Sequence, residues 1–366
     1  MRFEATRETL LGPLHSLIGV VERRQTLPVL GNVRVQVEES GLRLTTTDLE
    51  VELVAHVPCD VVATGTTTLP ARKWLDICRN LPEGATITVA IEKERAVLRS
   101  GRSRFTLATL SAAEFPEVES IGEVETVTLP RDQLRQLIER THFSMAQHDV
   151  RYYLNGLLFE LSTDGTRTVA TDGHRLAIAE AHTGGAIEGS RQVIVPRKGV
   201  QELLRLLGDD DDTTTIEFAD NHIRVQLGDI RLTSKLIDGR FPDYQRVIPE
   251  GGDKRLLVDR QSLRQALSRV YILSNEKYRG VRFQAEDDRL SVGSHNPEQE
   301  EAEEELEIEY GGPKIELGFN ANYLMDALGA IEADRVEVIL TDSNSSGLLY
   351  GEGDESARYV VMPMRL

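Results

Sequence analysis

Three side chains have types that could support catalysis or metal binding. Asp172 and His174 flank Gly173, and His222 could supply a third ligand or an acid/base partner. A metal-dependent hydrolase that uses these groups is therefore one hypothesis. Their spacing matches no HExxH or comparable metal motif, and a glycine between two polar residues is more typical of an exposed turn. The sequence therefore favours a turn that presents side chains to a partner.

Other motifs of catalysis are absent from the sequence. It contains no G-x-S-x-G nucleophile motif and no G-x-x-x-x-G-K phosphate loop. The two cysteines, Cys59 and Cys78, form no CxxC pair, which also favours a reducing compartment. We therefore expect a protein that is not an enzyme and that needs no cofactor and no metal ion.

The last residues are apolar, although most chain ends fray. Val360, Val361, Met362, Pro363 and Met364 are therefore expected to dock against the rest of the fold. Methionine side chains are flexible and polarizable, so a surface built from them adapts to several apolar peptides. Together with the turn at residues 171–176, they predict a partner-binding cleft that holds a few apolar anchors of a bound peptide. The alternative is that the two methionines only fill the core.

Length, composition and charge limit the possible classes of protein. The 366 residues allow two or three domains, and a hydrophobic content of 40% is enough for ordinary cores. No run approaches the ~18 apolar residues of a membrane span, and the first residues lack the apolar core of a signal peptide. We therefore expect a cytoplasmic protein without a membrane partner. The net charge of −18 argues against binding nucleic acid by bulk attraction, so the location of the cations matters.

The sequence contains three related units. A helix-like pattern that begins at Arg7 returns at Arg131 and at Arg260, at spacings of about 125 residues. Other matches keep the same order, namely Thr47-Asp48 with Thr171-Asp172, Pro70 with Pro196 and Asn320, and Phe115-Pro116-Glu117 with Phe241-Pro242-Asp243. We predict three domains at residues 1–122, 126–247 and 253–366, joined by polar linkers near residues 119–125 and 249–253.

Each unit is predicted to be an α+β domain. Residues 33–37, 223–227 and 336–340 alternate between apolar and polar side chains, which is typical of half-buried strands. Helical stretches are few. Thr6 and Asp259 stand where helix N-caps belong, and Pro130 stands where a helix start tolerates proline. Two helices against antiparallel sheet make a domain of ordinary size at about 120 residues.

The basic residues concentrate in and beside the predicted helices. They are Arg7, Arg23, Arg24, Arg72, Lys73, Arg79, Arg131, Arg135, Arg140, Arg197, Lys198, Arg205, Arg260, Arg264 and Arg269. Solvated helix faces are one explanation. The other is that the joined repeats line a basic concavity with their helices, with acidic strands outside. Such a body could surround DNA without base contacts, because phosphate contacts carry no sequence information.

The two ends of the chain are predicted to be complementary. The first unit has cations beside Phe105 and Leu107, whereas the third has Ile272 and Leu273 followed by an acidic run. The charged positions are Lys73, Arg95, Arg99, Arg102 and Arg104 in the first unit and Glu298, Glu300, Glu301, Glu303, Glu304 and Glu305 in the third. A head-to-tail contact between two chains would close the repeats into a ring. Two solvated charge runs are the alternative.

Seven segments, spread over the chain, resemble one known family. They are YYLNG at residues 152–156, TDGHRLA at 171–177, VPRKGV at 195–200, DGRFPDY at 238–244, ILSNEK at 272–277, NPEQEEAEE at 296–304 and MPMRL at 362–366. These segments resemble the bacterial replicative sliding clamps, the beta subunits of DNA polymerase III. The resemblance implies three similar clamp domains per chain and a head-to-tail homodimer ring. Helices would line its central channel, with antiparallel sheets outside.

The resemblance also implies the site residues. A peptide cleft is implied at Leu154, Thr171, Gly173, His174, Arg175, Leu176, Pro242, Arg246, Val247, Asn320, Tyr323, Ser346, Val360, Met362, Pro363, Met364 and Arg365. DNA contacts are implied at Arg24, Arg72, Lys73, His148, Tyr152, Tyr153 and Arg197, and dimer contacts at Phe105, Leu107, Ile272 and Leu273. Tyr152 and Tyr153 could stack on a template base, or they could be packed strand aromatics.

We therefore predict a DNA polymerase processivity factor. It would encircle double-stranded DNA at a primer-template without sequence specificity, and its cleft would bind short peptide motifs of polymerases and of the clamp loader. Topological attachment needs no strong phosphate affinity, so a net charge of −18 is compatible with DNA as a partner. A loader must open the ring, because the chain has no nucleotide site. The metal-dependent hydrolase and a peptide-binding scaffold without a DNA role stay open as alternatives.

Overall fold

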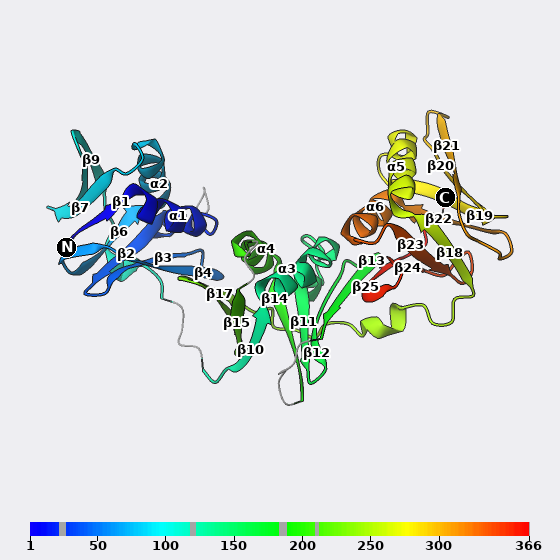
Figure 1. Cartoon of the computed structure of the whole chain (residues 1–366), viewed down its shortest axis with the longest axis horizontal. Helices are drawn as coiled ribbons and strands as arrows, with labels where there is room; N and C mark the ends of the chain where they lie inside the picture. Colours follow the sequence, from blue (N-terminus) through cyan, green and yellow to red (C-terminus); the bar gives the residue numbers. More distant parts are fainter. Residues whose placement is uncertain (22–26, 118–121, 183–188, 209–211, 366) are drawn as a thin grey trace. The chain divides into compact units, whose positions relative to one another are not determined.

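The computed structural model describes residues 1–21, 27–117, 122–182, 189–208 and 212–365 (Figure 1). The chain divides into two compact units, Met1–Asp132 with Lys198–Leu236 and Gln133–Arg197 with Ile237–Leu366, which we name the first unit and the second unit. Arg24, one of the predicted DNA contacts, lies outside the described residues. Part of the predicted linker near residues 119–125 also lies outside them.

The first unit is mostly antiparallel sheet. Its helices are α1 (Arg7–Leu17) and α2 (Ala71–Asn80), with the 3-10 turns η1 (Pro28–Gly31) and η2 (Ala112–Glu114). Its strands are β1 (Arg2–Thr6), β2 (Asn32–Glu38), β3 (Gly41–Thr47), β4 (Val51–Val57), β5 (Asp60–Ala63), β6 (Gly65–Pro70), β7 (Thr86–Glu92), β8 (Arg95–Ser100), β9 (Ser103–Ala108), β10 (Glu125–Pro130), β15 (Thr213–Phe218), β16 (His222–Leu227) and β17 (Ile230–Lys235). The division between the units falls within α3 (Arg131–Glu139) and α4 (Arg197–Leu206).

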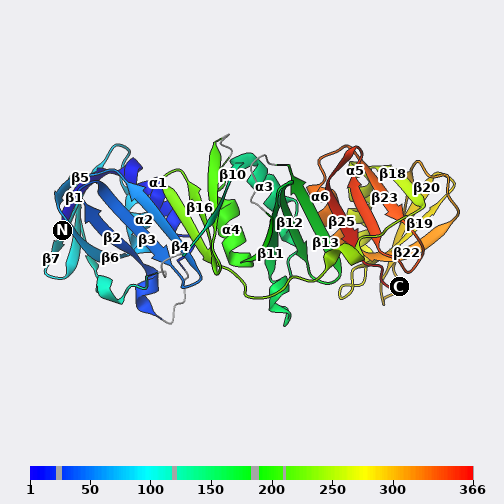
Figure 2. The same ribbon diagram turned by 90° about the horizontal axis from the view of Figure 1, so that it is seen from below.

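Two sheets organise the first unit. One has the strand order β5-β1-β7-β8-β9, and the other has the order β10-β15-β16-β17-β4-β3-β2-β6. The pairing of β17 with β4 joins two distant parts of the sequence, with Leu232 opposite Leu53 and Ser234 opposite Val51. Figure 2 shows β2, β3 and β4 side by side. Helix α1 packs against β4, and α2 packs against β2 and β6.

The second unit repeats this plan. Its helices are α5 (Arg260–Val270) and α6 (Ala321–Ala330), and its 3-10 turns are η3 (His142–Ser144), η4 (Tyr152–Leu154), η5 (Tyr244–Val247) and η6 (Tyr271–Leu273). Its strands are β11 (Gly156–Ser162), β12 (Gly165–Thr171), β13 (Arg175–Ala181), β14 (Ser190–Pro196), β18 (Lys254–Asp259), β19 (Gly280–Glu286), β20 (Arg289–His295), β21 (Glu301–Glu307), β22 (Ile315–Asn320), β23 (Arg335–Leu340), β24 (Gly347–Gly351) and β25 (Asp354–Val361).

The sheets of the second unit mirror those of the first. Their strand orders are β14-β11-β12-β13-β25-β24-β23-β18 and β21-β20-β19-β22. The pairing of β13 with β25 places Leu176 opposite Val360, so the last strand of the chain completes the larger sheet. Leucines of α5 and α6, among them Leu263 and Leu328, are buried together with Phe283 of β19. Burial of such side chains stabilises a domain by about 1.5–3 kcal/mol each.

The helix starts follow the sequence signals. Thr6 caps α1 by accepting a hydrogen bond from the Thr9 amide at 3.2 Å, and Asp259 caps α5 by accepting one from the Ser262 amide at 2.7 Å. Pro130 directly precedes α3. These three predictions are confirmed. Among the described residues, no helix combines the length and the apolar character needed to cross a bilayer.

The strand predictions are also confirmed, whereas the linker near residues 249–253 stays a prediction. Residues 33–37 lie in β2, 223–227 in β16 and 336–340 in β23, and each strand alternates mainly between buried and partly exposed side chains. Residues 249–253 form an irregular segment between η5 and β18.

Two arginines that begin the first helix of a repeat donate hydrogen bonds to carbonyls near the end of the second helix. Arg7 Nε donates to Cys78 O at 2.9 Å, near the end of α2. Arg260 Nη1 donates to Leu328 O at 3.3 Å, near the end of α6. A cation stabilises the unpaired carbonyls and the negative dipole at a helix C-terminus. Arg7 and Arg260 therefore stabilise helix ends, a role that the sequence did not indicate.

We expect Asp259→Ala to lower the free energy of unfolding of the second unit by about 1 kcal/mol, because the first turn of α5 loses its cap. Asp259→Asn is the matched control, since an amide oxygen can still accept from the Ser262 amide. Urea denaturation followed by circular dichroism measures both variants. Equal losses in the two variants would contradict the capping role.

Candidate functional site

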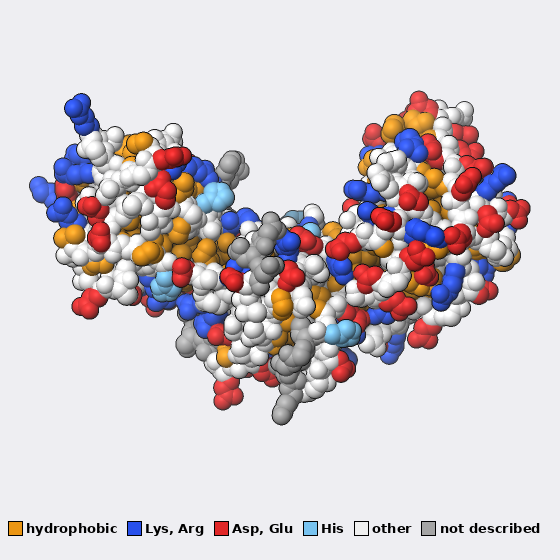
Figure 3. All heavy atoms as spheres, in the orientation of Figure 1, with side chains coloured by type: hydrophobic (Ala, Val, Ile, Leu, Met, Phe, Trp, Pro, Cys, Tyr) orange, Lys and Arg blue, Asp and Glu red, His pale blue; other side chains and the backbone are white. Residues whose placement is uncertain are grey.

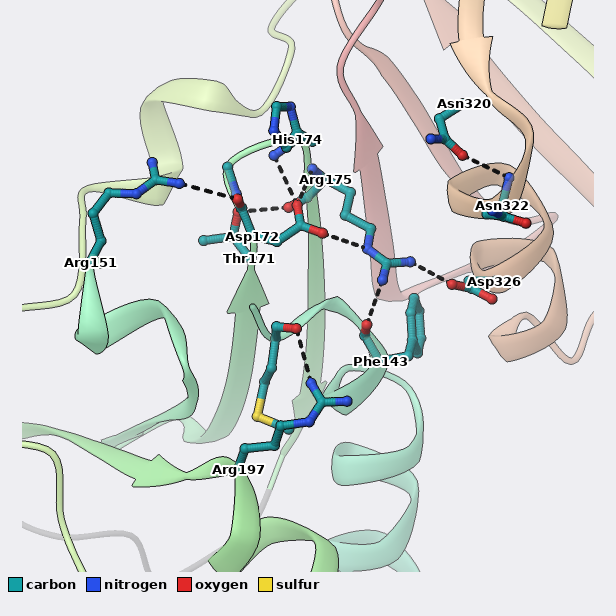
Figure 4. A network of polar contacts seen from close by, with 12 residues as sticks. Phe143, Arg151, Thr171, Asp172, His174, Arg175, Arg197, Asn320, Asn322 and Asp326 are labelled. Carbon is teal, nitrogen blue, oxygen red and sulfur yellow. Dashed lines mark hydrogen bonds and ion pairs between the residues drawn. The ribbon is translucent and has the colours of Figure 1, made fainter. Parts of the chain in front are cut away.

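The turn between β12 and β13 is held by its own side chains (Figure 4). Thr171 Oγ1 donates to Arg175 O at 2.6 Å and accepts from the Gly173 amide at 3.1 Å. Asp172 Oδ1 accepts from the amides of His174 at 2.9 Å and Arg175 at 3.1 Å. Gly173 has φ +88°, which favours glycine. The sequence therefore builds a fixed turn that leaves Gly173 and His174 exposed.

Arg175 attaches this turn to two neighbouring elements. Its guanidinium donates to Asp172 Oδ2 at 3.1 Å and to Phe143 O at 2.7 Å, and it pairs with Asp326 on α6. It also lies over the Tyr323 ring, 4.6 Å from the centroid, which adds a cation–π contact. Only 13% of the Arg175 side chain is exposed. The role of Arg175 is therefore mainly to connect the turn to Phe143 and to α6.

The end of the chain docks on the same turn. The Met362 amide donates to His174 O at 2.9 Å, and the Met364 amide donates to Gly318 O at 2.9 Å. Met362, Pro363 and Met364 are half-buried, so each still offers apolar surface to solvent. The prediction that the apolar end docks against the fold is confirmed.

Three of the predicted cleft residues form a floor beneath this surface. Leu154, Leu176 and Val360 are buried, with exposures of 2%, 2% and 0%. Leu176 and Val360 belong to an apolar cluster that also contains Phe241 and Tyr244. These side chains shape the site from below, and their contact with a ligand stays a prediction.

The other predicted cleft residues border the turn or the last strand. Pro242 and Val247 are exposed beside η5, and Arg246 is exposed with an ion pair to Asp243 at 2.7 Å. Asn320 caps α6 by accepting from the Asn322 amide at 2.9 Å. The remaining members are Thr171, Tyr323 and Ser346, which are partly buried, and Arg365, which is exposed. All belong to the second unit.

The geometry of Asp172 disfavours the hydrolase hypothesis. One carboxylate oxygen accepts two amides of the turn, and the other accepts from Arg175, so the group acts as a structural element. His222 belongs to the first unit, where its Nδ1 lies 2.7 Å from Asn221 Oδ1. In the described ranges, no three His, Cys, Asp or Glu side chains gather in a way that could hold a metal ion.

The predicted DNA contacts of the first unit lie on α2. Arg72 and Lys73 are exposed, and Arg72 Nη2 also donates to Val21 O at 2.6 Å. Both side chains line a cavity of ≈ 610 Å³, together with Arg79. This surface offers cations to a phosphate backbone.

The predicted DNA contacts of the second unit lie on loops and helix starts. Tyr152 is 56% exposed on η4, and its ring centroid lies 5.8 Å from that of Tyr153. Turn η4 is a 3-10 turn and not a strand, and Tyr153 packs partly against the apolar cluster that contains Leu176 and Val360, so packing accounts for Tyr153 but not for exposed Tyr152. His148 is exposed at φ +55°. Arg197 donates to Met145 O at 3.1 Å, and its burial lowers its pKa without removing its charge.

The predicted dimer contacts of the first unit lie on an edge strand. Strand β9 ends the five-stranded sheet, so within the described part of the chain one side of its backbone lacks a strand partner. Arg102 and Arg104 are exposed near or on this strand, Phe105 is half-buried, and Leu107 is buried. In Figure 3, Lys and Arg side chains gather over this end of the first unit.

A second edge strand carries the acidic residues. Strand β21 ends the four-stranded sheet of the second unit, and Glu301 and Glu303 on it are exposed, as are Glu298 and Glu300 just before it. Ile272 on η6 is 73% exposed and Leu273 is half-buried. Glu304 instead pairs with Arg269 of α5 at 2.7 Å, and this hydrogen bond lowers the pKa of Glu304. Glu304 therefore has an internal partner, and its contact with a cation of another chain stays a prediction.

Comparisons with known proteins decide the family. Three family models of the DNA polymerase III beta subunit match the chain: the N-terminal domain at residues 1–119, the central domain at 128–243 and the C-terminal domain at 245–365. The chain belongs to the DNA polymerase III beta subunit family. Relatives named beta sliding clamp include one from Pseudomonas putida at 53% identity and one from Escherichia coli K12 at 51%, each covering 100% of both chains.

Solved beta subunits share the fold of this chain. The DNA polymerase III beta subunit of Pseudomonas aeruginosa is 51% identical, with a TM-score of 0.98 and 100% of both chains covered. A sliding clamp of the same organism bound to griselimycin is 52% identical, with a TM-score of 0.97 and the same coverage. The family resemblance and the three-domain α+β clamp fold are thus confirmed. The boundaries at 1–122, 126–247 and 253–366 stay predictions.

Three supporting residues of this beta subunit site were missed in the sequence. Arg151 donates to Asp172 O at 3.3 Å and binds Asp149, and the hydrogen bonds from Arg151 lower the pKa of Asp149 to about 2. The Phe143 carbonyl accepts a hydrogen bond from Arg175, and the Asp326 carboxylate forms an ion pair with it. The signal for Arg151 was its position beside the two tyrosines. Nothing in the sequence pairs Arg175 with Phe143 or Asp326, which lie far from it along the chain.

We expect Arg175→Lys to loosen the turn, because an ammonium group cannot reproduce the guanidinium contacts in three directions. Amide hydrogen exchange at His174 and Met362 should become at least about tenfold faster, with no change in β1–β9. Arg246→Lys, at an exposed position, is the control. Unchanged protection in Arg175→Lys would contradict the holding role of Arg175.

Proposed function

We propose that this chain is a DNA polymerase processivity factor, a clamp that encircles duplex DNA and tethers polymerases through short peptides. The observation that carries the proposal is the identity of 51–53% to proteins named beta sliding clamp over the whole chain. The clamp itself catalyses no reaction, and it acts in the cytoplasm.

A closed ring requires two chains that meet head to tail. The edge strands β9 and β21 support this arrangement, because free strand edges can pair across an interface. Their side chains have opposite charges, with Arg102 and Arg104 at one edge and Glu301 and Glu303 at the other. Exposed Ile272 would supply apolar area at the same contact. The partner in this proposal is therefore a second copy of the chain.

The ring would hold DNA without binding it tightly. Cations on α2 and Arg197 would contact phosphates through non-specific, salt-screened interactions. Exposed Tyr152 could stack on an unpaired base at a primer-template end, a contact of about 1–3 kcal/mol. A net charge of −18 would limit adhesion to DNA and favour sliding.

The peptide cleft would lie where the end of the chain meets the turn of β12 and β13. Half-buried Met362 and Met364 above a floor of Leu176 and Val360 offer an adaptable apolar surface. Griselimycin, bound to the clamp of Pseudomonas aeruginosa, is a suitable probe of this surface. Polymerases and the clamp loader would present short apolar segments to it.

Deleting residues 362–366 should weaken griselimycin binding at least about 100-fold, because the apolar wall of the cleft is lost. The dimer should persist, since β9 and β21 are untouched. Isothermal titration measures binding, and sedimentation measures the dimer. The control is Met364→Leu, which keeps apolar volume and should bind within about threefold of the parent. Normal binding by the truncated chain would refute the cleft.

Topological attachment has a direct test. Once placed on nicked circular DNA by its clamp loader, the protein should stay bound through gel filtration at high salt. Cutting the circle should release it, because a ring slides off a free end. Release from circular DNA at the same rate would contradict encirclement, and would favour a scaffold without a DNA role.

A further inference from the structure

The first unit contains a pocket in the repeat position of the proposed peptide cleft. Its volume is ≈ 390 Å³. It is lined by Thr47, Leu49, Glu50, Pro116, Glu117, Asn221, His222, Thr233, Lys235 and Leu236. Pro116 corresponds to Pro242 in the sequence repeat, and Thr47 corresponds to Thr171. We name this pocket the second cleft, and the site of the second unit the first cleft.

The second cleft is built on the same turn as the first. Thr47 Oγ1 donates to Val51 O at 2.9 Å and accepts from the Leu49 amide at 3.1 Å. Asp48 Oδ1 accepts from the amides of Glu50 at 2.9 Å and Val51 at 2.7 Å. Each of these four hydrogen bonds has a counterpart in the turn at residues 171–175. The two backbones therefore have the same local design.

The strand that crosses the turn is also repeated. The Lys235 amide donates to Glu50 O at 2.9 Å, as the Met362 amide donates to His174 O at 2.9 Å. Ser234 lies opposite Val51, as Val361 lies opposite Arg175. These contacts make Lys235 the counterpart of Met362, and Glu50 the counterpart of His174.

Leu49 and Gly173 occupy equivalent positions in the two turns, but only Leu49 has a side chain. Leu49 has φ +83° and Gly173 has φ +88°, a region that is unstrained only for glycine. The Leu49 side chain is 43% exposed and lines the second cleft, so burial in a core does not explain it. At Gly173, an added Cβ would lie 3.0 Å from Arg151 Nη2. A side chain at this position would therefore crowd Arg151 in the first cleft. A strained residue at a surface pocket points to a functional reason.

We propose that the second cleft is a copy of the peptide cleft that is closed to apolar peptides. Leu49, Glu50 and Lys235 close it, where Gly173, His174 and Met362 open the first cleft. Leu49 presents an apolar side chain to the pocket at the turn position where Gly173 has none. Glu50 and Lys235 place charges where an apolar ligand would have to desolvate them without compensation. This inference rests on the proposed function of the first cleft, and it predicts that one chain binds one peptide.

The single change Gly173→Leu tests the role of the leucine. Because Leu49 occupies the same turn in the first unit, the turn should survive with leucine at this position. Griselimycin binding should fall at least tenfold, while circular dichroism and the dimer stay unchanged. The reverse change, Leu49→Gly, is the control and should leave affinity and the ratio of one ligand per chain unchanged. Parent-like binding by Gly173→Leu would overturn the proposal.

The stricter test opens the second cleft. Leu49→Gly/Glu50→His/Lys235→Met should bind a second equivalent of griselimycin, measured by isothermal titration. In the chain that lacks residues 362–366, the same three changes should restore a detectable binding site. A ratio that stays at one, with no binding restored in the truncated chain, would overturn the inference alone. A parent chain that binds no griselimycin would overturn the proposed function as well.

Discussion

Two antiparallel strand pairings are the constraint on which the rest of the structure depends. β17 pairs with β4 in the first unit, and β13 pairs with β25 in the second, so each pairing joins two repeats through main-chain hydrogen bonds. Each junction is therefore part of one continuous antiparallel sheet. Each junction ends in the same Thr-Asp turn, and the proposed peptide cleft stands on one of them. The proposed surface for partners therefore lies where two repeats are joined.

The charges of the chain serve two different purposes. Arg7, Arg175 and Arg260 bind carbonyls inside the fold, where they stabilise helix ends or the turn. Arg72 and Lys73 are exposed and remain available to a polyanion. An acidic protein can therefore act on DNA, since only a small set of its cations must face the duplex. Composition alone does not separate these two sets.

Much of the fold and part of the site could be predicted from the sequence. Local signals located the caps Thr6 and Asp259 and the alternating strands, because neighbouring residues determine these features, and matches along the chain located the repeats. The contacts of Arg175 with Phe143 and Asp326 could not be predicted, since only the folded chain brings them together. The same holds for Glu304, whose place in an acidic run gave no indication of its pair with Arg269. The family resemblance supplied the candidate ligand contacts, which local patterns cannot specify.

The central claim is that two copies of this chain close into a ring through β9 and β21. Electron microscopy of the purified protein tests this claim most directly. Sedimentation at the same concentration gives the mass of the particles. The account predicts particles of twice the chain mass with a closed outline and a central hole wide enough for duplex DNA. Compact monomers, or dimers without a hole, would contradict it.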